Sequence, residues 1–363
     1  MNSTSTKTKK KRSNWVEWLW ATLGAFVIAL IIKLFLFEVF VIPTTSMERT
    51  LLVGDYVLMS KIHYGPRLPI TPIAFPFSHN ELPFVGGKSY KEDYQWKYRR
   101  LPGIFGIERG DVLVFNYPHQ KEPVDRRENF VKRCVGFPGD ELSIVNGRIL
   151  ANGEALDFFE DMQFDYNMIT ENKRLDREWM QKWEITEGGQ RSTKGHYQFS
   201  MPPYIADSLS KEPYVKRIER ANVDKGVVVE NETVFPHVPK NYPWNLDNYG
   251  VIHIPKRGDT LALSLKNLPI YQRIIQGYEG HTVMVKDKKI YIDGVVSSEY
   301  VIMMDYFFMV GDNRHNSADS RFWGFVPEDH ILGKALFLCF SVKPGLKWFH
   351  RGGIRWERLF RSI

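Results

Sequence analysis

Residues 128–156 read ENFVKRCVGFPGDELSIVNGRILANGEAL, and this stretch decides the fold class. Short apolar runs alternate with Gly, Asp and Asn, a pattern typical of short β-strands joined by tight turns. Asn146-Gly147 lies between SIV and RIL, and this dipeptide is the strongest short-range signal for a two-residue hairpin. Asn152-Gly153 indicates another turn soon afterwards. The stretch therefore predicts consecutive β-hairpins.

The same pattern continues on both sides, with DYVLMSKI from Asp55 and DVLVFNYP from Asp111, so we expect a mainly β fold. ERGDVLVF from Glu108 also resembles KRGDTLAL from Lys256, and a hairpin pattern follows each of them. One interpretation is a diverged internal repeat, in which Lys132-Arg133 would correspond to Gln272-Arg273. The other is convergence on a common hairpin pattern, because turn chemistry alone produces such similarity. Both stay open.

Residues 18–37 are almost wholly apolar, and Lys33 is their one charged residue. About 20 such residues match the thickness of a bilayer, so we expect a transmembrane helix. The alternative, a cleavable signal peptide, would have a shorter apolar run and an A-x-A-like site. Five basic residues precede the helix, and the positive-inside rule keeps such a cluster in the cytoplasm. We therefore expect a single-pass protein of the cytoplasmic membrane with its body outside.

The formal net charge of +7 does not point to nucleic acid. Lys7, Lys9, Lys10, Lys11 and Arg12 supply five units, which leaves 7 − 5 = +2 for the body. A nearly neutral body is not typical of nucleic-acid binding, so we expect no nucleic-acid partner.

The two cysteines, Cys134 and Cys339, show no CxxC spacing and no neighbouring His cluster. We therefore expect no metal, and nothing indicates an organic cofactor. A disulfide and two free thiols both remain open.

Three segments carry candidate chemistry. Ser46 follows the apolar segment directly, in IPTTSMERTLLVGD, and a serine becomes nucleophilic when a base takes its proton. A lysine can be that base if desolvation lowers its pKa, and Lys132 has apolar neighbours in NFVKRCVGF. Residues 311–335, GDNRHNSADSRFWGFVPEDHILGKA, place many polar groups between apolar strands, where they need mutual hydrogen bonds.

With these segments the chain resembles the type I signal peptidase family, on SMERTLLVGD, RGDVLVF, VKRCVGFPGD and GDNRHNSADSR. The resemblance covers the anchor and residues of about 39–154 and 277–340. It implies a membrane-anchored, mainly β serine endopeptidase with a large insertion. Such an enzyme removes signal peptides from translocated preproteins at the outer surface of the cytoplasmic membrane, so preproteins and the lipid bilayer are the expected partners.

The resemblance also implies roles for single residues. Ser46 corresponds to the nucleophile, Lys132 to the general base, and the Thr44 hydroxyl and the Ser46 N–H to the oxyanion donors. Ser317 corresponds to the hydroxyl that orients the lysine. The residues expected to form a structural ion pair are Asp319 and Arg321. The residues expected to form shallow pockets for small side chains are Phe40, Ile42, Leu51 and Val131.

His315 departs from the family, which usually has Asp there. A histidine so near the site raises the alternative of a Ser/His pair, but Lys132 already fills the role of base. We interpret His315 as a neutral substitution.

The expected organisation places catalytic segments on both sides of an insertion of unknown role. Its parts are a cytoplasmic basic tail (1–14), the anchor (15–38), the first catalytic part (39–154), the insertion (155–254), the second catalytic part (255–340) and a basic aromatic tail (341–363). The last tail suits either a membrane interface or an ordinary packed terminus. Two other functions remain to be tested, an inactive membrane scaffold and a self-cleaving regulator, although a regulator would be expected to carry a DNA-binding module.

Overall fold

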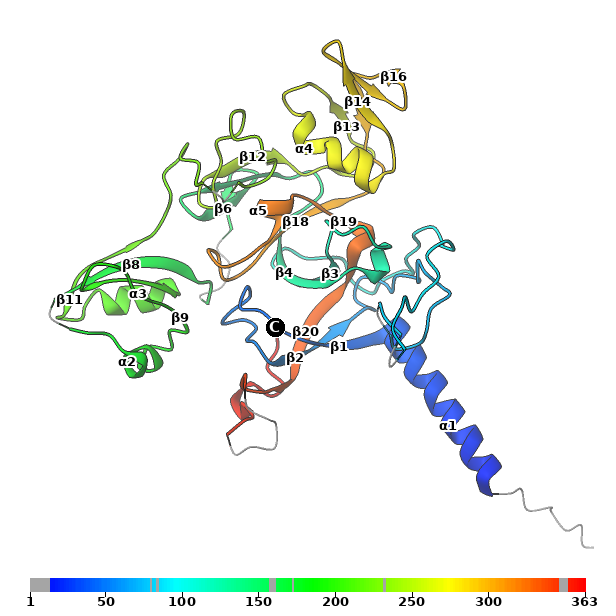
Figure 1. Ribbon diagram of the computed structural model, residues 1–363, viewed down its shortest axis with the longest axis horizontal. Helices are drawn as coiled ribbons and strands as arrows, with labels where there is room; N and C mark the ends of the chain where they lie inside the picture. The colour runs from blue at the N-terminus through cyan, green and yellow to red at the C-terminus, as the bar shows by residue number, and fades with distance from the viewer. Residues whose placement is uncertain are drawn as a thin grey trace, which may run out of the picture.

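The computed structural model describes residues 14–78, 80–82, 85–156, 161–171, 173–230, 233–345 and 352–363. The expected cytoplasmic tail lies outside these residues, apart from Asn14. A single long helix projects from a body made mainly of β-strands, so the expected fold class is confirmed (Figure 1).

A seven-stranded sheet forms the centre of the body, and every neighbouring pair in it is antiparallel. Two of its strands, VLVFN and YFFMV, are almost continuous apolar runs, because a strand covered on both faces has no polar side to alternate with. In spatial order the strands are β1 (Phe37–Val41), β2 (Asp55–Ser60), β20 (Ile331–Ser341), β3 (Val112–Asn116), β4 (Asn129–Gly136), β18 (Tyr306–Val310) and β19 (Val326–Pro327).

The hairpins predicted from residues 128–156 belong to a second sheet. Val145 pairs with Arg148, and both turn residues, Asn146 (φ 48°) and Gly147 (φ 78°), have the positive φ that a type I′ turn requires. The Asn152-Gly153 turn is built in the same way and joins β6 to β7. In spatial order the strands are β12 (Tyr249–His253), β5 (Glu141–Val145), β6 (Arg148–Ala151) and β7 (Glu154–Ala155).

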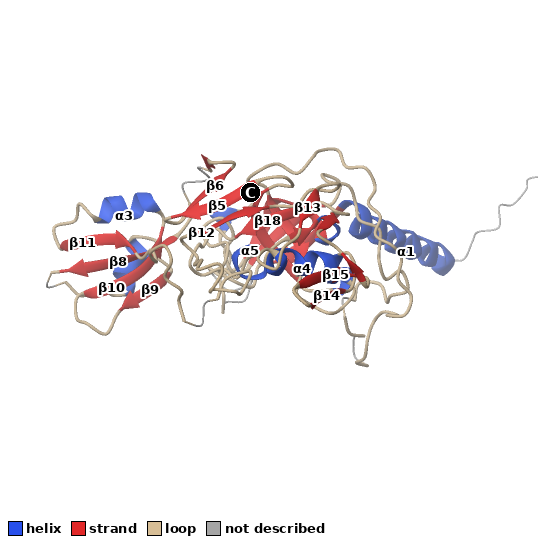
Figure 2. Cartoon of the chain, turned by 90° about the horizontal axis from the view of Figure 1, so that it is seen from above, coloured by secondary structure: helices blue, strands red, loops and turns tan. Residues whose placement is uncertain are grey.

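The middle of the expected insertion folds as a small unit, which we call the inserted subdomain (residues 161–220). Most of its aromatic residues pack in a core of their own, which includes the buried Trp179 and Phe199. Figure 2 shows it at one end of the molecule, with the long helix at the other. Its strands in spatial order and its helices are β11 (Val215–Arg220), β8 (Phe164–Thr170), β10 (His196–Met201), β9 (Glu187–Gln190), α2 (Arg177–Lys182) and α3 (Pro203–Leu209).

The structure supports only part of the possible internal repeat. In both Arg-Gly-Asp turns, 109–111 and 257–259, the Asp carboxylate accepts the backbone N–H three residues earlier at 2.9 Å. The correspondence fails at the lysine, because Lys132 lies on strand β4 whereas Gln272 lies on helix α4 (Leu268–Arg273). The remaining strands of this half are β13 (Thr260–Ala262), β17 (Glu299–Val301), β14 (Val283–Lys286), β15 (Lys289–Ile292) and β16 (Val295–Val296).

The long helix α1 (Asn14–Ile31) continues as a π-helical turn, η1 (Ile32–Leu36), and then enters β1 directly. Together, Trp15–Leu36 form a 22-residue span that is long and apolar enough to cross a membrane. None of this span is buried in the protein. The two charged residues of the span are Glu17 and Lys33, and Nζ of Lys33 lies 3.7 Å from the carboxylate of Glu38 at the start of the body.

The described part of the carboxyl-terminal tail packs on the central sheet. The guanidinium groups of Arg355 and Arg358 both contact the buried carboxylate of Asp55, at 3.3 and 2.6 Å. The cysteines are not joined: Cys134 is buried, Cys339 is partly buried, and both thiols are free.

Candidate active site

Ser46 lies in the turn between β1 and β2, which we call the nucleophile turn (residues 43–54). The turn closes because the N–H of Gly54 donates to the carbonyl of Ile42 at 2.9 Å. Met47 and Leu51, the apolar residues of SMERTLL, are buried in a core cluster with β2, β3 and β20. The apolar side chains thus anchor the turn, while Ser46 stays partly exposed.

Lys132 approaches Ser46 from strand β4 and is 3% exposed. Its Nζ donates a hydrogen bond to Oγ of Ser46. Burial lowers the pKa of the Lys132 ammonium to about 8, although the carboxylates of Asp319 and Asp312 oppose the shift. The Ser46 hydroxyl is therefore hydrogen-bonded to a lysine that loses its proton more easily than a free lysine does.

Thr44 lies on the exposed side of the same turn. Its Oγ1 is 3.4 Å from Oγ of Ser46. Among the described residues, the Thr44 hydroxyl makes no hydrogen bond to the backbone. The hydroxyl is thus close to the place where an oxyanion would develop during attack by Ser46.

The loop of residues 311–321, which we call the polar loop, backs the pair. Asp319 (0% exposed) and Arg321 (1%) form a buried ion pair at 2.7 Å. The Asp319 carboxylate also accepts the N–H of Gly311 at 3.0 Å, and Arg321 donates to the carbonyl of Arg314 at 2.6 Å. Burial raises the pKa of Asp319, but Arg321, the Gly311 N–H and Lys132 together outweigh it and leave a net lowering, so this carboxylate stays charged. The pair holds both ends of the loop together.

Ser317 is buried in this loop against the nucleophile turn. A Cβ added at Gly311 would lie 2.1 Å from Oγ of Ser317 and 2.5 Å from the carbonyl oxygen of Ser46, so only glycine permits this approach. Within the described part of the chain, the Ser317 hydroxyl makes a long hydrogen bond to the carbonyl of Ala318 (3.5 Å) and none to Lys132. Its orienting role stays a prediction.

A cavity of about 250 Å³ opens beside the Ser46–Lys132 pair. Three of the four residues expected to form substrate pockets line it: Phe40, Ile42 and Val131. Leu51 does not, because it is fully buried beneath the turn and packs with the core. The sequence did not single out the further lining residues Val41, Pro43, Met47, Glu128, Asn129 and Phe130.

Comparison with known proteins decides the family. The family model described as "Signal peptidase, peptidase S26" matches residues 15–208 and 295–340, which is more than half of the chain. The chain belongs to this family. It is therefore a serine peptidase, and the match extends to residue 208, through about half of the expected insertion (155–254).

Relatives of this peptidase match it over most of its length. A signal peptidase I of Helicobacter pylori is 28% identical over 359 residues, covering 97% of this chain and 91% of the relative. A signal peptidase I of Rickettsia massiliae is 26% identical and covers 100% of this chain and 98% of the relative. For one of Buchnera aphidicola the identity is 25%, with coverages of 92% and 79%.

Arg133 and Asp312 are two residues of the peptidase site that the sequence interpretation missed. They form a buried ion pair at 2.5 Å, and Thr50 of the nucleophile turn donates to the Asp312 carboxylate at 2.6 Å. The pair therefore joins strand β4, the polar loop and the nucleophile turn directly behind Lys132. Both residues lie inside the motifs that carried the resemblance, and their opposite charges were the available signal.

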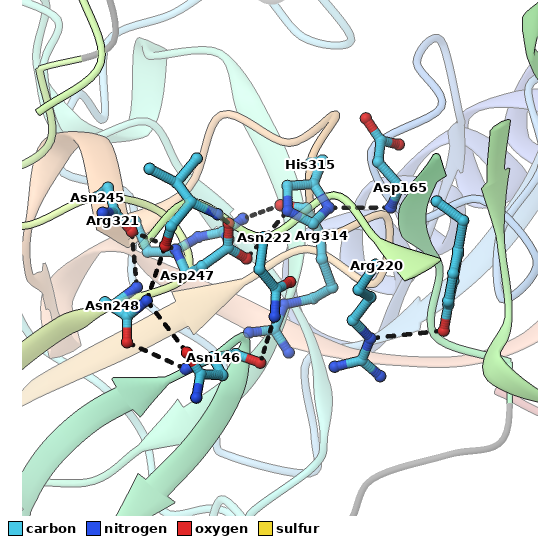
Figure 3. A network of polar contacts seen from close by, with 12 residues as sticks. Asn146, Asp165, Arg220, Asn222, Asn245, Asp247, Asn248, Arg314, His315 and Arg321 are labelled. Carbon is cyan, nitrogen blue, oxygen red and sulfur yellow. Dashed lines mark hydrogen bonds and ion pairs between the residues drawn. The ribbon is translucent and has the colours of Figure 1, made fainter. Parts of the chain in front are cut away.

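The contacts of His315 do not fit the role of general base (Figure 3). Its Nδ1 accepts the backbone N–H of Asp165 at 3.1 Å, and its Nε2 lies 3.0 Å from the carboxylate of Asp247. Burial raises the pKa of Asp247, but the hydrogen bond from His315 helps to give a net lowering, so the carboxylate is charged. Both ring nitrogens are thus used to join the polar loop to β8 and to the segment before β12.

Proposed function

We propose that this chain removes signal peptides from preproteins, with Ser46 as the nucleophile and Lys132 as the general base. The hydrogen bond between a buried lysine and a partly exposed serine carries the proposal. Relatives bearing the name signal peptidase I along most of the chain support the reaction and the preprotein substrates.

Lysine starts the reaction in its neutral form. Nζ of Lys132 takes the proton of the Ser46 hydroxyl while Oγ attacks the scissile carbonyl carbon. The carbonyl oxygen becomes an oxyanion, and we assign its stabilisation to the Ser46 N–H and the Thr44 hydroxyl. The C–N bond then breaks, and the Lys132 ammonium returns its proton to the leaving amine. The signal peptide is left as an ester on Ser46.

Hydrolysis repeats these steps with water. Neutral Lys132 takes a proton from water as the water oxygen attacks the ester carbon. The ester bond to Oγ then breaks, and the lysine ammonium protonates Oγ, which restores the Ser46 hydroxyl and releases the signal peptide. We assign the side chains before the cut to the apolar cavity lined by Phe40, Ile42 and Val131, and we expect small ones to be preferred there.

We further propose that the body lies on the outer face of the cytoplasmic membrane and contacts the bilayer. Phe77, on the loop after β2, is half exposed, and its ring centroid lies 5.5 Å from that of Phe26 in α1. Phe26 is ten residues before the end of the span, or roughly 15 Å at helical rise. This contact supports a loop that enters the bilayer beside the anchor.

A cleavage assay tests the proposed function. The detergent-solubilised protein is incubated with a preprotein beside Ser46→Ala, Lys132→Ala and Lys132→Arg. All three variants should lose cleavage while keeping their thermal midpoints, because nucleophile and base act as a unit and arginine does not deprotonate in proteins. Near-normal turnover by Lys132→Arg would overturn the lysine base. An inactive wild-type protein would instead favour a scaffold, and cleavage of the chain itself a regulator.

A further inference from the structure

The inserted subdomain makes direct contact with the nucleophile turn. Glu184 lies in the turn that follows α2, and Glu187 is the first residue of the edge strand β9. Glu184 binds Arg49 twice, through its carboxylate and its carbonyl oxygen, each at 2.7 Å. Arg49 is three residues beyond Ser46 and has a positive φ of 75°, a conformation that costs free energy in a non-glycine residue. The subdomain thus helps to hold a strained residue of this turn.

Glu187 reaches closer to the reacting residues through two asparagines of the polar loop. Its carboxylate accepts the side-chain N–H of Asn313 at 2.8 Å and that of Asn316 at 3.0 Å. The same amide nitrogens bind Thr45: Asn313 donates to its carbonyl at 3.2 Å, and Asn316 donates to its hydroxyl at 3.1 Å. The backbone N–H of Asn313 also donates to the carbonyl of Ser46 at 3.1 Å.

The chemistry of the carboxylate gives these contacts a direction. An ionised carboxylate accepts hydrogen bonds but cannot donate them, whereas each amide group can turn either its NH2 or its oxygen toward a neighbour. Glu187 therefore requires both asparagines to present NH2, and that orientation is the one that reaches Thr45. Asn313 is 0% exposed, so an amide turned the wrong way could not be corrected by water.

We propose that Glu187 is a positioning residue for Ser46, which acts by orienting Asn313 and Asn316 so that they fix the Thr45–Ser46 backbone. The inference rests on the proposed function, because it assigns a role in the same reaction. Glu187 lines no part of the cavity beside Ser46, so it holds the nucleophile without contacting the substrate. A role of this region is then to complete the catalytic geometry.

Steady-state kinetics on the full chain tests the proposal. Glu187→Ala removes all three side-chain hydrogen bonds, and a nucleophile displaced by a fraction of an ångström should lower kcat by roughly 10- to 100-fold. KM should change little, because the pocket is untouched. Glu187→Gln keeps one oxygen as acceptor for both asparagines, so its kcat should stay within about threefold of wild type, since one weak bond is lost.

Glu171→Ala is the matched control, because Glu171 is an exposed carboxylate of the same subdomain that pairs with Lys216 at 3.0 Å and does not touch the turn. Its kcat and its thermal midpoint should both equal those of wild type, because only an exposed ion pair is lost. An unchanged kcat in Glu187→Ala, or a Gln variant as slow as the Ala variant, would overturn the positioning role. Full activity of Ser46→Ala would instead reject the proposed function itself, so the two failures are distinguishable.

Discussion

Nζ of Lys132 donates its hydrogen bond to Oγ of Ser46, and this one contact suits both protonation states of the lysine. As an ammonium, the lysine donates to the serine oxygen. Once it has lost a proton, its lone pair can accept the serine proton along the same line. The geometry for proton transfer is therefore formed before substrate arrives, and the protonation state of the lysine decides whether transfer can occur.

The first prediction concerns pH. Burial lowers the pKa of Lys132 to about 8, and the reactive form is neutral, so kcat/KM should rise between about pH 7 and pH 9 and then level off. The sign follows from the base: lowering pH through this pKa protonates the lysine and removes activity. The measurement is kcat/KM for a peptide substrate across this range. A flat profile, with chemistry shown to limit the rate, would contradict the lysine mechanism.

The second prediction concerns orientation. The basic residues before Trp15 should be cytoplasmic and the body should be outside, because positive charge next to a span stays in the cytoplasm. A protease added to intact spheroplasts should therefore digest the body and spare an amino-terminal tag. The control is lysed spheroplasts, in which the tag should also be removed. Protection of the body in intact spheroplasts would reverse the proposed topology.

Local sequence patterns were sufficient for the central strands and for the hairpins. The Asn146-Gly147 turn forms where it was predicted, because both residues tolerate positive φ. The inserted subdomain gave a weaker signal, because only FDYNMIT and HYQFSM, which form β8 and β10, alternate apolar and polar residues. Its edge strand β9 is EGGQ, without an apolar period, and its helices α2 and α3 have six and seven residues, too few to show one.

At the active site, too, local sequence patterns could not predict contacts that form only in the folded chain. The sequence shows that Leu51 is apolar. It does not show whether the Leu51 side chain lines the cavity or packs beneath the nucleophile turn. Arg133 and Asp312 are 179 residues apart, so their pairing depends on how β4 and β18 meet in the folded sheet. Glu187 was missed for a related reason, since its partners lie 126 and 129 residues away.

The third prediction separates the two possible bases. His315→Gln should leave the alkaline limb of the pH profile in place and keep the rate within about tenfold of wild type. The glutamine amide can still accept from Asp165 and donate to Asp247, whereas it cannot act as a base at any ordinary pH. The measurement is the pH profile of the variant. Loss of all cleavage with an unchanged thermal midpoint would instead assign the role of base to His315.

The last prediction tests Thr44 as the second oxyanion donor, by comparing Thr44→Ser, Thr44→Ala and Thr44→Val. Serine keeps the hydroxyl near Ser46 and should retain most activity, whereas alanine and valine should slow acylation by roughly a hundredfold or more. Valine preserves the β-branched shape, so a loss shared by Ala and Val cannot be attributed to packing.

The rival interpretation makes Thr44 a turn former whose hydroxyl caps nearby backbone. Within the described residues its hydroxyl contacts Ser46 Oγ at 3.4 Å and no backbone group, which favours the oxyanion role. Cleavage rates and thermal midpoints of all three variants decide between the two. If Ala and Val cleave normally but melt earlier, Thr44 is structural, and the second donor must come from another group at the turn. If their rates fall while their midpoints hold, the hydroxyl acts on the transition state, because a cap that stabilises the folded turn would have moved the midpoint first.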